Sequence, residues 1–399
     1  MPSVILKPGR EKSLLRRHPW IFSGAIQHVD EEIASGSTVD VLSSKGDFLA
    51  RGAYSPQSQI RVRAWTFEDE PVDQDFFRKK IRASLTIRST LLLGEGSGAR
   101  STNAIRLIYA ESDSIPGLIV DRYDDVLVLQ SLTAGSEYWK ETIADILLEE
   151  TGLKNIYERS DADVRELEGL SPRVGILRGT IPESRITITE FGLKFLVDIQ
   201  HGHKTGLYLD QRANRQRVRT LAKNKDVLDC FCYTGGFTLN ALVGDAKSVL
   251  SVDASSEALT LARQNIELNK LPIEKAQFLE GDVFQVLRKF RDEARSFDMI
   301  ILDPPKFAPT AAQAEKAARG YKDINLLAFK LLRPNGILFT FSCSGGIDSA
   351  LFQKIVAGAA LDAGVEAQII EHLSQASDHP ISLHFPEGAY LKGFVCIKK

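Results

Sequence analysis

From about residue 226, short apolar segments alternate with segments of helical periodicity, and this alternation restricts the fold more than any other feature of the sequence. The apolar segments are "DVLDCF", "KSVLSVD", "AQFLEGD", "FDMIILDPP" and "GILFTFSC". The helical segments between and after them are "FTLNALVG", "SSEALTLARQNIELNK", "VFQVLRKFRDEA", "YKDINLLAFKLL" and "DSALFQKIVAGAALDAG". Strands that are apolar along their whole length are typical of a sheet covered on both faces. The pattern predicts an α/β fold with a doubly wound parallel sheet.

The residues before this point predict two further domains. In the first, "STVDVLSSKGDFLARGAYSPQSQIRVRAWTF" shows short strands broken by glycine, with a hairpin turn at "SSKGDF", which favours a small β-barrel. The next part has mixed character and predicts an α+β domain. Its expected elements are helices over 73–93 and near 136–150, a loop over 94–103, and strands near 104–110, 126–133, 154–159, 185–189 and 193–199. We therefore expect domains over 1–72, 73–190 and 191–399.

Composition narrows the class of protein. No apolar run reaches the roughly 18 residues that a membrane span needs, and the N-terminus lacks the apolar stretch and cleavage site of a signal peptide, so we expect a cytoplasmic location. The four cysteines are expected to be reduced thiols, and the histidines show no metal-ligand spacing, so we expect no metal. A net charge of −2 argues against a uniformly basic nucleic-acid binder but leaves room for local basic patches.

Acidic residues and glycines follow the predicted strands at the edge where such sheets bind ligands. Asp229 closes the first strand, and Gly235 and Gly236 open the next helix, where the missing Cβ atoms let a cofactor approach the backbone. Asp253 ends the second strand and suits two ribose hydroxyls, and Asp282 ends the third and suits an adenine amino group. A two-glycine turn alone is usually structural, but together these positions predict a nucleotide site.

The turn "VLDCFCYTG" resembles the V-L-D-x-G-x-G-T-G motif of S-adenosylmethionine-dependent methyltransferases. Phe231 and Tyr233 stand where that motif usually has glycine, a departure that resembles the RNA base methyltransferases. The G-x-G-x-x-G fingerprint of nicotinamide cofactors is missing from the chain. The remaining cofactor candidates flank these strand ends and are Phe231, Tyr233, Thr234, Ala254, Val283, Asp303 and Pro304.

Cys343, in "ILFTFSCSGG", ends the fifth predicted strand and is expected to lie near Asp303 of "DPPKF". Position alone leaves it open whether this cysteine is a small buried residue or a nucleophile. Beside a methyl-donor site, the nucleophile is favoured, because a thiolate that adds to carbon 6 of cytosine makes carbon 5 reactive. Asp303, protonated or hydrogen-bonded to the N3 edge of the base, would stabilise the developing charge. Cys230, Cys232 and Cys396 are expected to be structural.

Two groups of basic residues are candidates for RNA contacts. The first is next to Trp20 and comprises Arg10, Lys12, Arg16, Arg17 and His18. These side chains either grip a phosphate backbone or form a solvated turn with Trp20 in the core. The second group is a predicted helix carrying Arg212, Arg215, Arg217 and Arg219, which suits phosphate, the carboxylate of a methyl donor, or a solvated face.

Across nearly its whole length, the chain resembles the large-subunit ribosomal RNA cytosine-C5 methyltransferase I family. The resemblance rests on "KPGREKSLLRRHPWIFSGAI", "LARGAYSPQSQIRVR", "LVDIQHGHKTGLYLDQR", "FCYTGGF", "SVDASSEAL", "LDPPKF", "RGYKDIN", "FTFSCSG" and "FPEGAYLKGF". It implies an N-terminal PUA domain for RNA, a middle α+β domain and a C-terminal Rossmann-like methyltransferase domain. It also implies S-adenosylmethionine as cofactor, 23S rRNA as substrate and Cys343 as nucleophile.

The resemblance also suggests further site residues. In the motif "HGHKTGLYLDQR", Tyr208, Asp210 and Gln211 are expected at the cofactor, and Lys204 and Arg212 at the RNA. Other RNA cytosine-C5 methyltransferases have D-x-P-C, whose second cysteine helps to release the product. Lys306 holds that place here, so Lys306, another residue or water must assist release. The oligomeric state stays open, with a homodimer as one possibility.

Two other functions remain as alternatives. In amino-group methylation of a base, the D-P-P sequence would be followed by an aromatic residue that stacks on the base, but Lys306 stands there and Phe307 comes one later. A non-catalytic RNA-binding assembly factor would keep only a remnant of the cofactor pocket and would not bind S-adenosylmethionine. Replacing Cys343 by alanine separates the two chemistries, because only C5 methylation needs the thiol.

Overall fold

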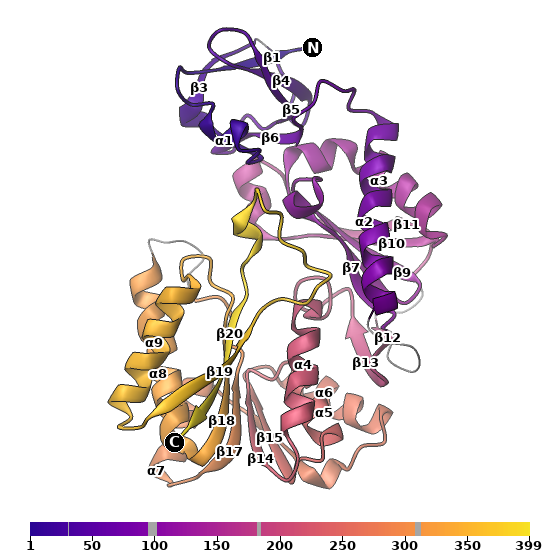
Figure 1. Cartoon of the computed structure of the whole chain (residues 1–399). Helices are drawn as coiled ribbons and strands as arrows, with labels where there is room; N and C mark the ends of the chain where they lie inside the picture. The colour runs from indigo at the N-terminus through magenta and orange to yellow at the C-terminus, as the bar shows by residue number, and fades with distance from the viewer. Residues whose placement is uncertain (31, 95–101, 182–184, 308–312) are drawn as a thin grey trace. The chain divides into compact units, whose positions relative to one another are not determined.

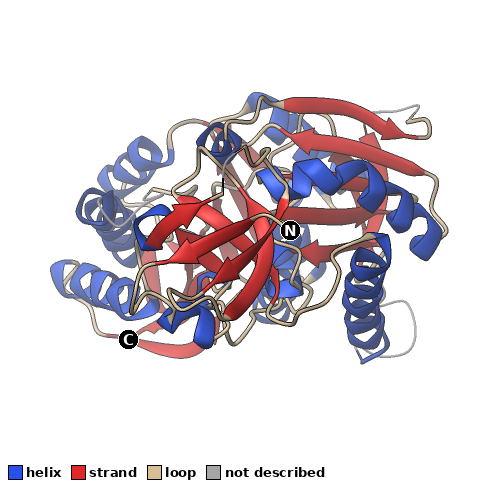
Figure 2. Cartoon of the chain, turned by 90° about the horizontal axis from the view of Figure 1, so that it is seen from above, coloured by secondary structure: helices blue, strands red, loops and turns tan. Residues whose placement is uncertain are grey.

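The computed structural model describes residues 1–399 except 31, 95–101, 182–184 and 308–312. The described residues contain nine α-helices and twenty strands, which Figure 2 distinguishes by colour. They form two compact units. Unit 1 comprises Met1–Gly192, Val197–Leu209 and Ser377–Gly388, and unit 2 comprises Leu193–Leu196, Asp210–Ala376 and Ala389–Lys399. Unit 1 therefore includes two short segments that follow its main part in the sequence, one near the middle of the chain and one near its C-terminus.

The first sheet of unit 1 has six strands in the order β2-β6-β5-β4-β1-β3 (Figure 1). Its elements are β1 (Ser3–Leu6), α1 (Lys12–Leu15), β2 (Trp20–Phe22), β3 (Ile26–Val29), β4 (Thr38–Leu42), β5 (Phe48–Tyr54) and β6 (Ile60–Thr66). The predicted hairpin turn at "SSKGDF" joins β4 to β5, which pair antiparallel. Gly52 in β5 has no room for a side chain, because a Cβ atom there would lie 2.4 Å from the Arg63 carbonyl oxygen on β6.

The second sheet of unit 1 has five strands in the order β11-β10-β9-β8-β7 and carries two long helices. These elements are α2 (Gln74–Gly94), β7 (Ala104–Tyr109), β8 (Leu118–Tyr123), β9 (Val126–Ser131), α3 (Ala134–Thr151), β10 (Asn155–Ser160) and β11 (Arg173–Arg178). Both helices, the strands β7, β9 and β10, and β12 (Arg185–Glu190) confirm the elements predicted within 73–190, whereas most of the loop predicted over 94–103 lies outside the described residues. The strands β8 and β11 were not predicted. β8 is hidden in the sequence because a two-residue turn separates it from β9.

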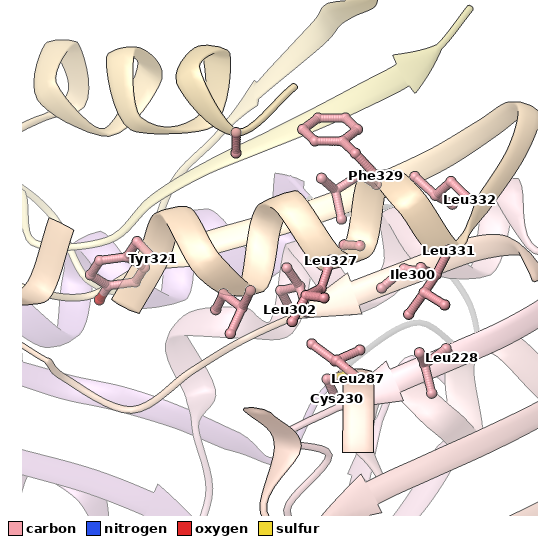
Figure 3. Close-up of a cluster of buried hydrophobic side chains, with 14 of the residues drawn as sticks. Leu228, Cys230, Leu287, Ile300, Leu302, Tyr321, Leu327, Phe329, Leu331 and Leu332 are labelled. Carbon is pink, nitrogen blue, oxygen red and sulfur yellow. The ribbon is translucent and has the colours of Figure 1, made fainter. Parts of the chain in front are cut away.

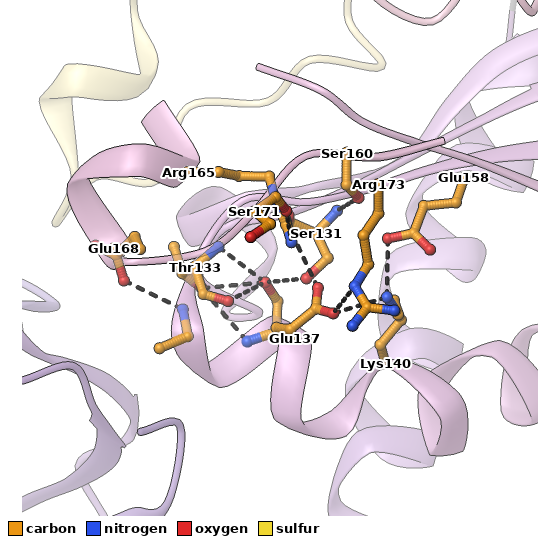
Figure 4. A network of polar contacts seen from close by, with 12 residues as sticks. Ser131, Thr133, Glu137, Lys140, Glu158, Ser160, Arg165, Glu168, Ser171 and Arg173 are labelled. Carbon is orange, nitrogen blue, oxygen red and sulfur yellow. Dashed lines mark hydrogen bonds and ion pairs between the residues drawn. The ribbon is translucent and has the colours of Figure 1, made fainter. Parts of the chain in front are cut away.

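A buried polar network fixes the start of α3 against β9 (Figure 4). Thr133 caps the helix through a reciprocal capping box with Ser136. The Arg165 guanidinium donates to the Ser131 carbonyl and, at 2.9 Å, to the Glu137 carboxylate. Burial works against ionisation of Glu137, but hydrogen bonds from Lys140 and Arg165 outweigh it and lower the pKa of Glu137. Each charge in this network is therefore paired, which is the condition for keeping charges inside a protein.

Unit 2 is built around a seven-stranded sheet in the order β16-β15-β14-β17-β18-β20-β19. A two-stranded sheet of β12 (Arg185–Glu190) and β13 (Leu193–Asp198) precedes it, and the division between the units falls within β13. The elements of unit 2 are α4 (Arg212–Leu221), β14 (Asp226–Cys230), α5 (Gly236–Val243), β15 (Ser248–Asp253), α6 (Ser256–Leu268), β16 (Ala276–Glu280), α7 (Val283–Asp292), β17 (Phe297–Leu302), α8 (Ala314–Leu331), β18 (Leu332–Ser342), α9 (Ser349–Asp362), β19 (Ala367–Leu373) and β20 (Lys392–Lys398).

The five predicted strands of unit 2 are parallel, as expected, and helices cover both faces of the sheet. The helices α4, α5 and α6 lie on one face and α7, α8 and α9 on the other (Figure 1). The sheet is mixed, however, because β20 runs antiparallel to both β18 and β19. Neither β19 nor β20 was predicted. β19 has alternating burial and no following helix, so it lacks the pattern that identified the other strands.

A continuous apolar core lies between the sheet and the helices α7, α8 and α9 (Figure 3). Leu228 and Cys230 of β14, Ile300 and Leu302 of β17, and Tyr321 of α8 are all part of it and are fully or almost fully buried. The close packing of this core fixes the positions of the strand ends that carry the candidate site.

Candidate active site

The parallel strands of unit 2 end at one edge of the sheet, and the predicted site residues follow these ends. In register, Cys230 of β14 lies between Val252 of β15 and Leu302 of β17. Leu302 is in turn opposite Thr340 of β18, and Asp253 is opposite Glu280 of β16. The structure therefore brings Asp229, Asp253, Asp282, Asp303 and Cys343 to the same edge, as the sequence predicted.

The turn after β14 places large side chains where the backbone favours glycine. Phe231 and Tyr233 have φ angles of 61° and 48°, and Gly235 has 79°. The left-handed conformation costs an L-residue with a side chain roughly 1–2 kcal/mol. The two positions that depart from the methyltransferase motif therefore keep the backbone conformation that its glycines would adopt. Thr234, between them and the helix, is buried, and its carbonyl accepts a hydrogen bond from Asn265 at 3.1 Å.

Gly235 and Gly236 are required by packing as well as by access to the backbone. A Cβ atom at Gly235 would lie 3.0 Å from the Ala262 side chain of α6. A Cβ atom at Gly236 would lie 2.9 Å from Cδ of Arg215, a buried residue of α4. The glycine turn thus has the structural role that the sequence left open, and this role is compatible with a ligand at the same turn.

Asp229 is fully buried at the end of β14. One carboxylate oxygen accepts a hydrogen bond from Thr238 at 2.7 Å, and the other, Oδ1, has no hydrogen-bond partner among the described residues. Burial, together with the charges of Asp303 and Asp253, raises the pKa of Asp229 to about 7. An orphaned carboxylate oxygen at a ligand-binding edge is suited to a cationic group such as an ammonium.

The next two acidic residues are open to a ligand. The Asp253 carboxylate is half-buried and accepts hydrogen bonds from the backbone N–H groups of Tyr233 (2.8 Å) and Ser255 (3.0 Å), while Ala254 is exposed. Asp282 is the N-cap of α7: its Oδ1 accepts from the backbone N–H of Gln285 at 3.0 Å. The following residue, Val283, is buried. Acceptor oxygens at these two strand ends suit the hydroxyls of a ribose and an exocyclic amino group, so the donor and acceptor set fits a nucleoside that carries a cation.

Asp303 is held by a chain of side-chain amides. Gln211 Nε2 donates to Asp303 Oδ1 at 2.9 Å, and Asn214 Nδ2 donates to Gln211 Oε1 at 2.6 Å. Asp210, adjacent to Gln211, accepts a short hydrogen bond from the Tyr390 hydroxyl. After Asp303, Pro304 is buried, and the following Lys306 is exposed. Gln211, a predicted cofactor residue, is therefore hydrogen-bonded to the DPPKF turn, and Asp210, another predicted cofactor residue, directly precedes it.

Cys343 differs from the other cysteines in its exposure. It is half-buried, and its Sγ lies 4.0 Å from the Pro304 carbonyl oxygen, so the thiol and the DPPKF turn are neighbours. Cys230, Cys232 and Cys396 are buried, and burial raises the pKa of each, that of Cys396 to about 12. These three thiols are thus confirmed as buried core groups.

Lys392 is a residue of this edge that the sequence analysis missed. It opens β20, and its Nζ donates to the carbonyl oxygens of Ser344 (2.7 Å) and Tyr390 (2.8 Å). Burial lowers the pKa of Lys392 to about 8, although the charge of Cys343 favours its ammonium form. The available signal was a single lysine at the head of the apolar run "GFVCI".

The basic residues near the N-terminus belong to unit 1 and lie mostly at the surface. The exposed members are Arg10, Lys12, Arg16 and Arg17. Arg17 pairs with Glu68 at 3.0 Å, and the half-buried His18 lies 3.3 Å from the Glu387 carboxylate. The half-buried Trp20 donates to Glu111 at 2.8 Å and packs edge-on against Phe385. An RNA contact by this group stays a prediction.

The basic residues of the "HGHKTGLYLDQR" region have different surroundings. Lys204 Nζ lies 4.5 Å from the centre of the Tyr208 ring, a cation–π contact within unit 1. Arg212 is buried in α4. Arg217 pairs with Glu371 of β19 at 2.5 Å. The roles expected for Lys204, Tyr208 and Arg212 at RNA or cofactor stay predictions.

Among the residues that the structure describes, no helix has the length and apolar character needed to cross a bilayer. Within the same residues, no cluster of three or more His, Cys, Asp or Glu side chains has the arrangement of a metal site.

Comparison with known proteins assigns a family model to each end of the chain. Residues 4–67 match the PUA-like domain, and residues 176–380, about half of the chain, match the S-adenosylmethionine-dependent methyltransferase model. The ribosomal RNA large subunit methyltransferase I of Tolumonas auensis is 53% identical over 395 residues, covering 98% of each chain. The protein of the same name from Aliivibrio fischeri is 51% identical over 395 residues, covering 99% of this chain and 98% of the relative.

Solved structures confirm the fold over the full length. A putative SAM-dependent methyltransferase from Streptococcus mutans matches with a TM-score of 0.85 at 21% identity, covering 100% of both chains. A putative methyltransferase complexed with SAH matches with a TM-score of 0.86 at 22% identity and the same coverage. At these identities the likeness shows the fold alone: a PUA-like domain and a Rossmann-like methyltransferase sheet.

Proposed function

Because the chain belongs to the ribosomal RNA large subunit methyltransferase I family, we propose that it methylates carbon 5 of a cytosine in 23S rRNA. The family is S-adenosylmethionine-dependent, and this cofactor supplies an electrophilic methyl group on a sulfonium. In the proposal, Cys343 is the nucleophile that activates the base. The observation that carries it is the position of the half-buried Cys343 thiol, 4.0 Å from Pro304 of the DPPKF turn, at the edge that carries the acidic residues.

The acidic edge supplies the contacts that such a cofactor needs. Asp253 would hold the ribose hydroxyls, and the second carboxylate oxygen of Asp282 the adenine amino group. The buried Asp229, whose Oδ1 has no partner among the described residues, is suited to the ammonium of the methionine part. The backbone of the glycine turn, at the half-buried Gly236 and the residues before it, would complete the cradle.

The chemistry of the base is carried by residues of the chain. The Cys343 thiolate adds to carbon 6 of cytosine and forms an S–C6 bond, which makes carbon 5 nucleophilic enough to take a methyl group. Asp303, held by Gln211, would bind the polar edge of the ring and stabilise the charge that develops there. Loss of the carbon-5 proton then expels the sulfur, which breaks the S–C6 bond and leaves 5-methylcytosine. In the proposal, Lys306, which is exposed at the place of a second cysteine, another residue or water takes up this proton and assists the release.

The packing of Phe307 argues against amino-group methylation. That reaction needs an aromatic ring that is free to stack on the target base. The Phe307 ring instead packs against Tyr321, with the centres 4.7 Å apart, and against Phe284 at 5.8 Å. Phe307 is thus partly buried against the core beside α8, and Lys306 stands at the position that the base-stacking ring would occupy.

The PUA-like domain and its exposed basic residues suit the RNA part of the substrate. Arginine and lysine side chains at Arg10, Lys12, Arg16 and Arg17 would contact phosphates and hold the rRNA without reading its sequence. The target cytosine must leave its stack to reach the thiol, as bases do in enzymes that modify them.

The proposal is tested on unmethylated 23S rRNA with the purified full chain and S-adenosylmethionine, by mass spectrometry of the nucleosides. We expect one 5-methylcytidine per rRNA with the wild type and none with Cys343→Ala. Cys396→Ala, which removes a buried thiol of β20, is the matched control and should retain the activity. Product that persists in Cys343→Ala, or a methyl group on an exocyclic amine, would refute C5 chemistry. S-adenosylmethionine that does not bind in calorimetry would favour a non-catalytic factor.

A further inference from the structure

Lys392 and Cys343 lie at the same end of two neighbouring strands. β18 and β20 are antiparallel, and Lys392 is directly opposite Ser342 in the register. Cys343 is the next residue after Ser342, so the two side chains start from adjacent positions at the edge of the sheet. This juxtaposition depends on the pairing of β20 with β18, which the sequence pattern did not reveal.

The end group of the half-buried Lys392 is tied to the backbone next to Cys343. Its Nζ donates to the Ser344 carbonyl at 2.7 Å and to the Tyr390 carbonyl at 2.8 Å. Ser344 directly follows Cys343 and is itself buried, and its hydroxyl lies 2.9 Å from that of Tyr321. A lysine normally keeps its charged group in water, so an ammonium tied to the backbone next to a thiol is a built feature of this edge.

The charged groups around Lys392 come from several elements. Burial lowers the pKa of Lys392 to about 8, and Lys306, after β17, acts in the same direction. The charges of Cys343 and of Asp348, the N-cap of α9, favour the ammonium form. Tyr321 of α8 also interacts with the charge of Cys343. The ammonium and the sulfur anion therefore stabilise each other, whereas a neutral lysine would leave the thiolate without its cation.

We propose that Lys392 is a positioning residue that stabilises Cys343 as a thiolate. The thiol releases its proton to solvent, the S–H bond breaks, and Lys392 keeps its own proton and supplies the compensating charge. The inference rests on the proposed function, in which the Cys343 thiolate attacks carbon 6 of the base. It extends that function by naming the cation that makes the attacking sulfur available near neutral pH.

Lys398, on the same strand, provides a control with the same structural role and no thiolate to stabilise. Its Nζ also donates to two backbone carbonyls, those of Phe329 (2.9 Å) and Leu332 (2.6 Å). Burial alone lowers the pKa of Lys398. Lys392 and Lys398 are the first and last residues of β20, so they lie roughly 20 Å apart at about 3.3 Å per residue.

The test measures the rate at which iodoacetamide alkylates Cys343 as a function of pH, in the full chain without RNA or methyl donor. Mass spectrometry assigns the labelled thiol, and the other three cysteines are buried. We expect Lys392→Met to raise the midpoint of the pH profile by about one unit, so that alkylation at pH 7 slows by up to roughly tenfold. Lys392→Arg, which keeps the charge, and Lys398→Met should leave the midpoint unchanged.

An unchanged midpoint in Lys392→Met, with the buried cysteines still unlabelled, would overturn the proposal. If Lys392→Met labels Cys230 and so reveals unfolding, Lys392→Gln replaces it, because an amide keeps donors for the carbonyls without the charge. If the pH profile of Cys343 alkylation then had the same midpoint in Lys392→Gln as in the wild type, this result would also overturn the proposal.

The alkylation assay separates this inference from the proposed function, since it uses neither substrate. A shifted midpoint in a protein that does not form 5-methylcytidine would refute the function and leave the Lys392–Cys343 pair intact. In the active protein, the acidic limb of the kcat/KM profile should move upward in Lys392→Met, with activity partly restored at pH 9. Activity that falls by the same factor at every pH would instead indicate a merely structural lysine.

Discussion

Asp229→Asn should change how the stability of unit 2 depends on pH. The Asp229 carboxyl is fully buried, and burial with the nearby charges of Asp303 and Asp253 raises its pKa from 3.8 to about 7. The folded protein therefore keeps a proton between pH 4 and 7 that the unfolded chain has already released. The free energy of unfolding must fall as the pH rises through this window, because the unfolded state binds fewer protons.

The size of the effect follows from the shift. Each unit of pKa difference is worth about 1.4 kcal/mol, so the full window corresponds to roughly 4 kcal/mol as an upper value. Asparagine imitates the protonated carboxyl and can still accept the hydrogen bond from Thr238. We expect Asp229→Asn to match the wild type near pH 4 and to exceed its unfolding free energy at pH 8 by up to roughly 4 kcal/mol.

Urea denaturation followed by two signals measures this in the full chain. The three tryptophans, Trp20, Trp65 and Trp139, all lie in unit 1, so their fluorescence follows that unit. Far-UV circular dichroism follows both units, and the transition that fluorescence does not report belongs to unit 2. The two signals are needed because the two units can unfold in separate transitions, and each free energy of unfolding must be assigned to its own unit.

Asp226→Asn, at the other end of β14, is the matched control with the opposite sign. Burial opposes ionisation of Asp226, but hydrogen bonds from Arg333 and Ser248 outweigh it and lower its pKa. This carboxylate contributes stability above its unfolded pKa and loses it as the pH falls through the folded value. Asp226→Asn should thus destabilise unit 2 at pH 7 and less so in acid. If the free energy of unfolding of unit 2 changed with pH equally in wild type and in Asp229→Asn, Asp229 could not be the buried carboxyl that holds a proton between pH 4 and 7.

Three further substitutions test the core, the first sheet and the cofactor edge. Leu338→Ala in β18 removes a fully buried side chain and should lower the free energy of unfolding of unit 2, measured in urea, by about 2–5 kcal/mol. Leu361 is 78% exposed, so Leu361→Ala should change the same free energy by less than about 0.5 kcal/mol. Gly52→Ala places a Cβ atom 2.4 Å from the Arg63 carbonyl oxygen and should lower the melting temperature of unit 1 by tryptophan fluorescence; an unchanged melt would contradict the packing described for β5. Asp253→Asn removes the charge that would face the ribose, and calorimetry should show S-adenosylmethionine binding weakened roughly tenfold or more, with a small fall in the melting temperature because the amide oxygen keeps only one of the two backbone hydrogen bonds. Unaltered affinity would exclude Asp253 from the site.

Much of unit 2 could be predicted because its sequence pattern directly reflects where each element is buried in the fold. Strands such as β14 and β17 are buried on both faces, so they are apolar throughout and stand out between amphipathic helices. Parallel strands end at one edge, so the sequence alone was enough to predict that residues such as Asp229, Asp253 and Cys343 lie at the same edge. The left-handed backbone at Phe231 and Tyr233 likewise follows from the glycine positions of the motif that the turn resembles.

What the sequence determined, then, is the class of fold, the edge of the sheet and the chemical groups on it. Only the tertiary structure decided that β20 pairs antiparallel with β18 and so brings Lys392 next to Cys343, and that residues 377–388 pack with unit 1. It also decided that Gln211 and Asn214 orient Asp303. The physical reason is that periodicity and strand order along the chain record local burial, whereas these contacts join residues far apart in the sequence, and nothing in either segment encodes its partner.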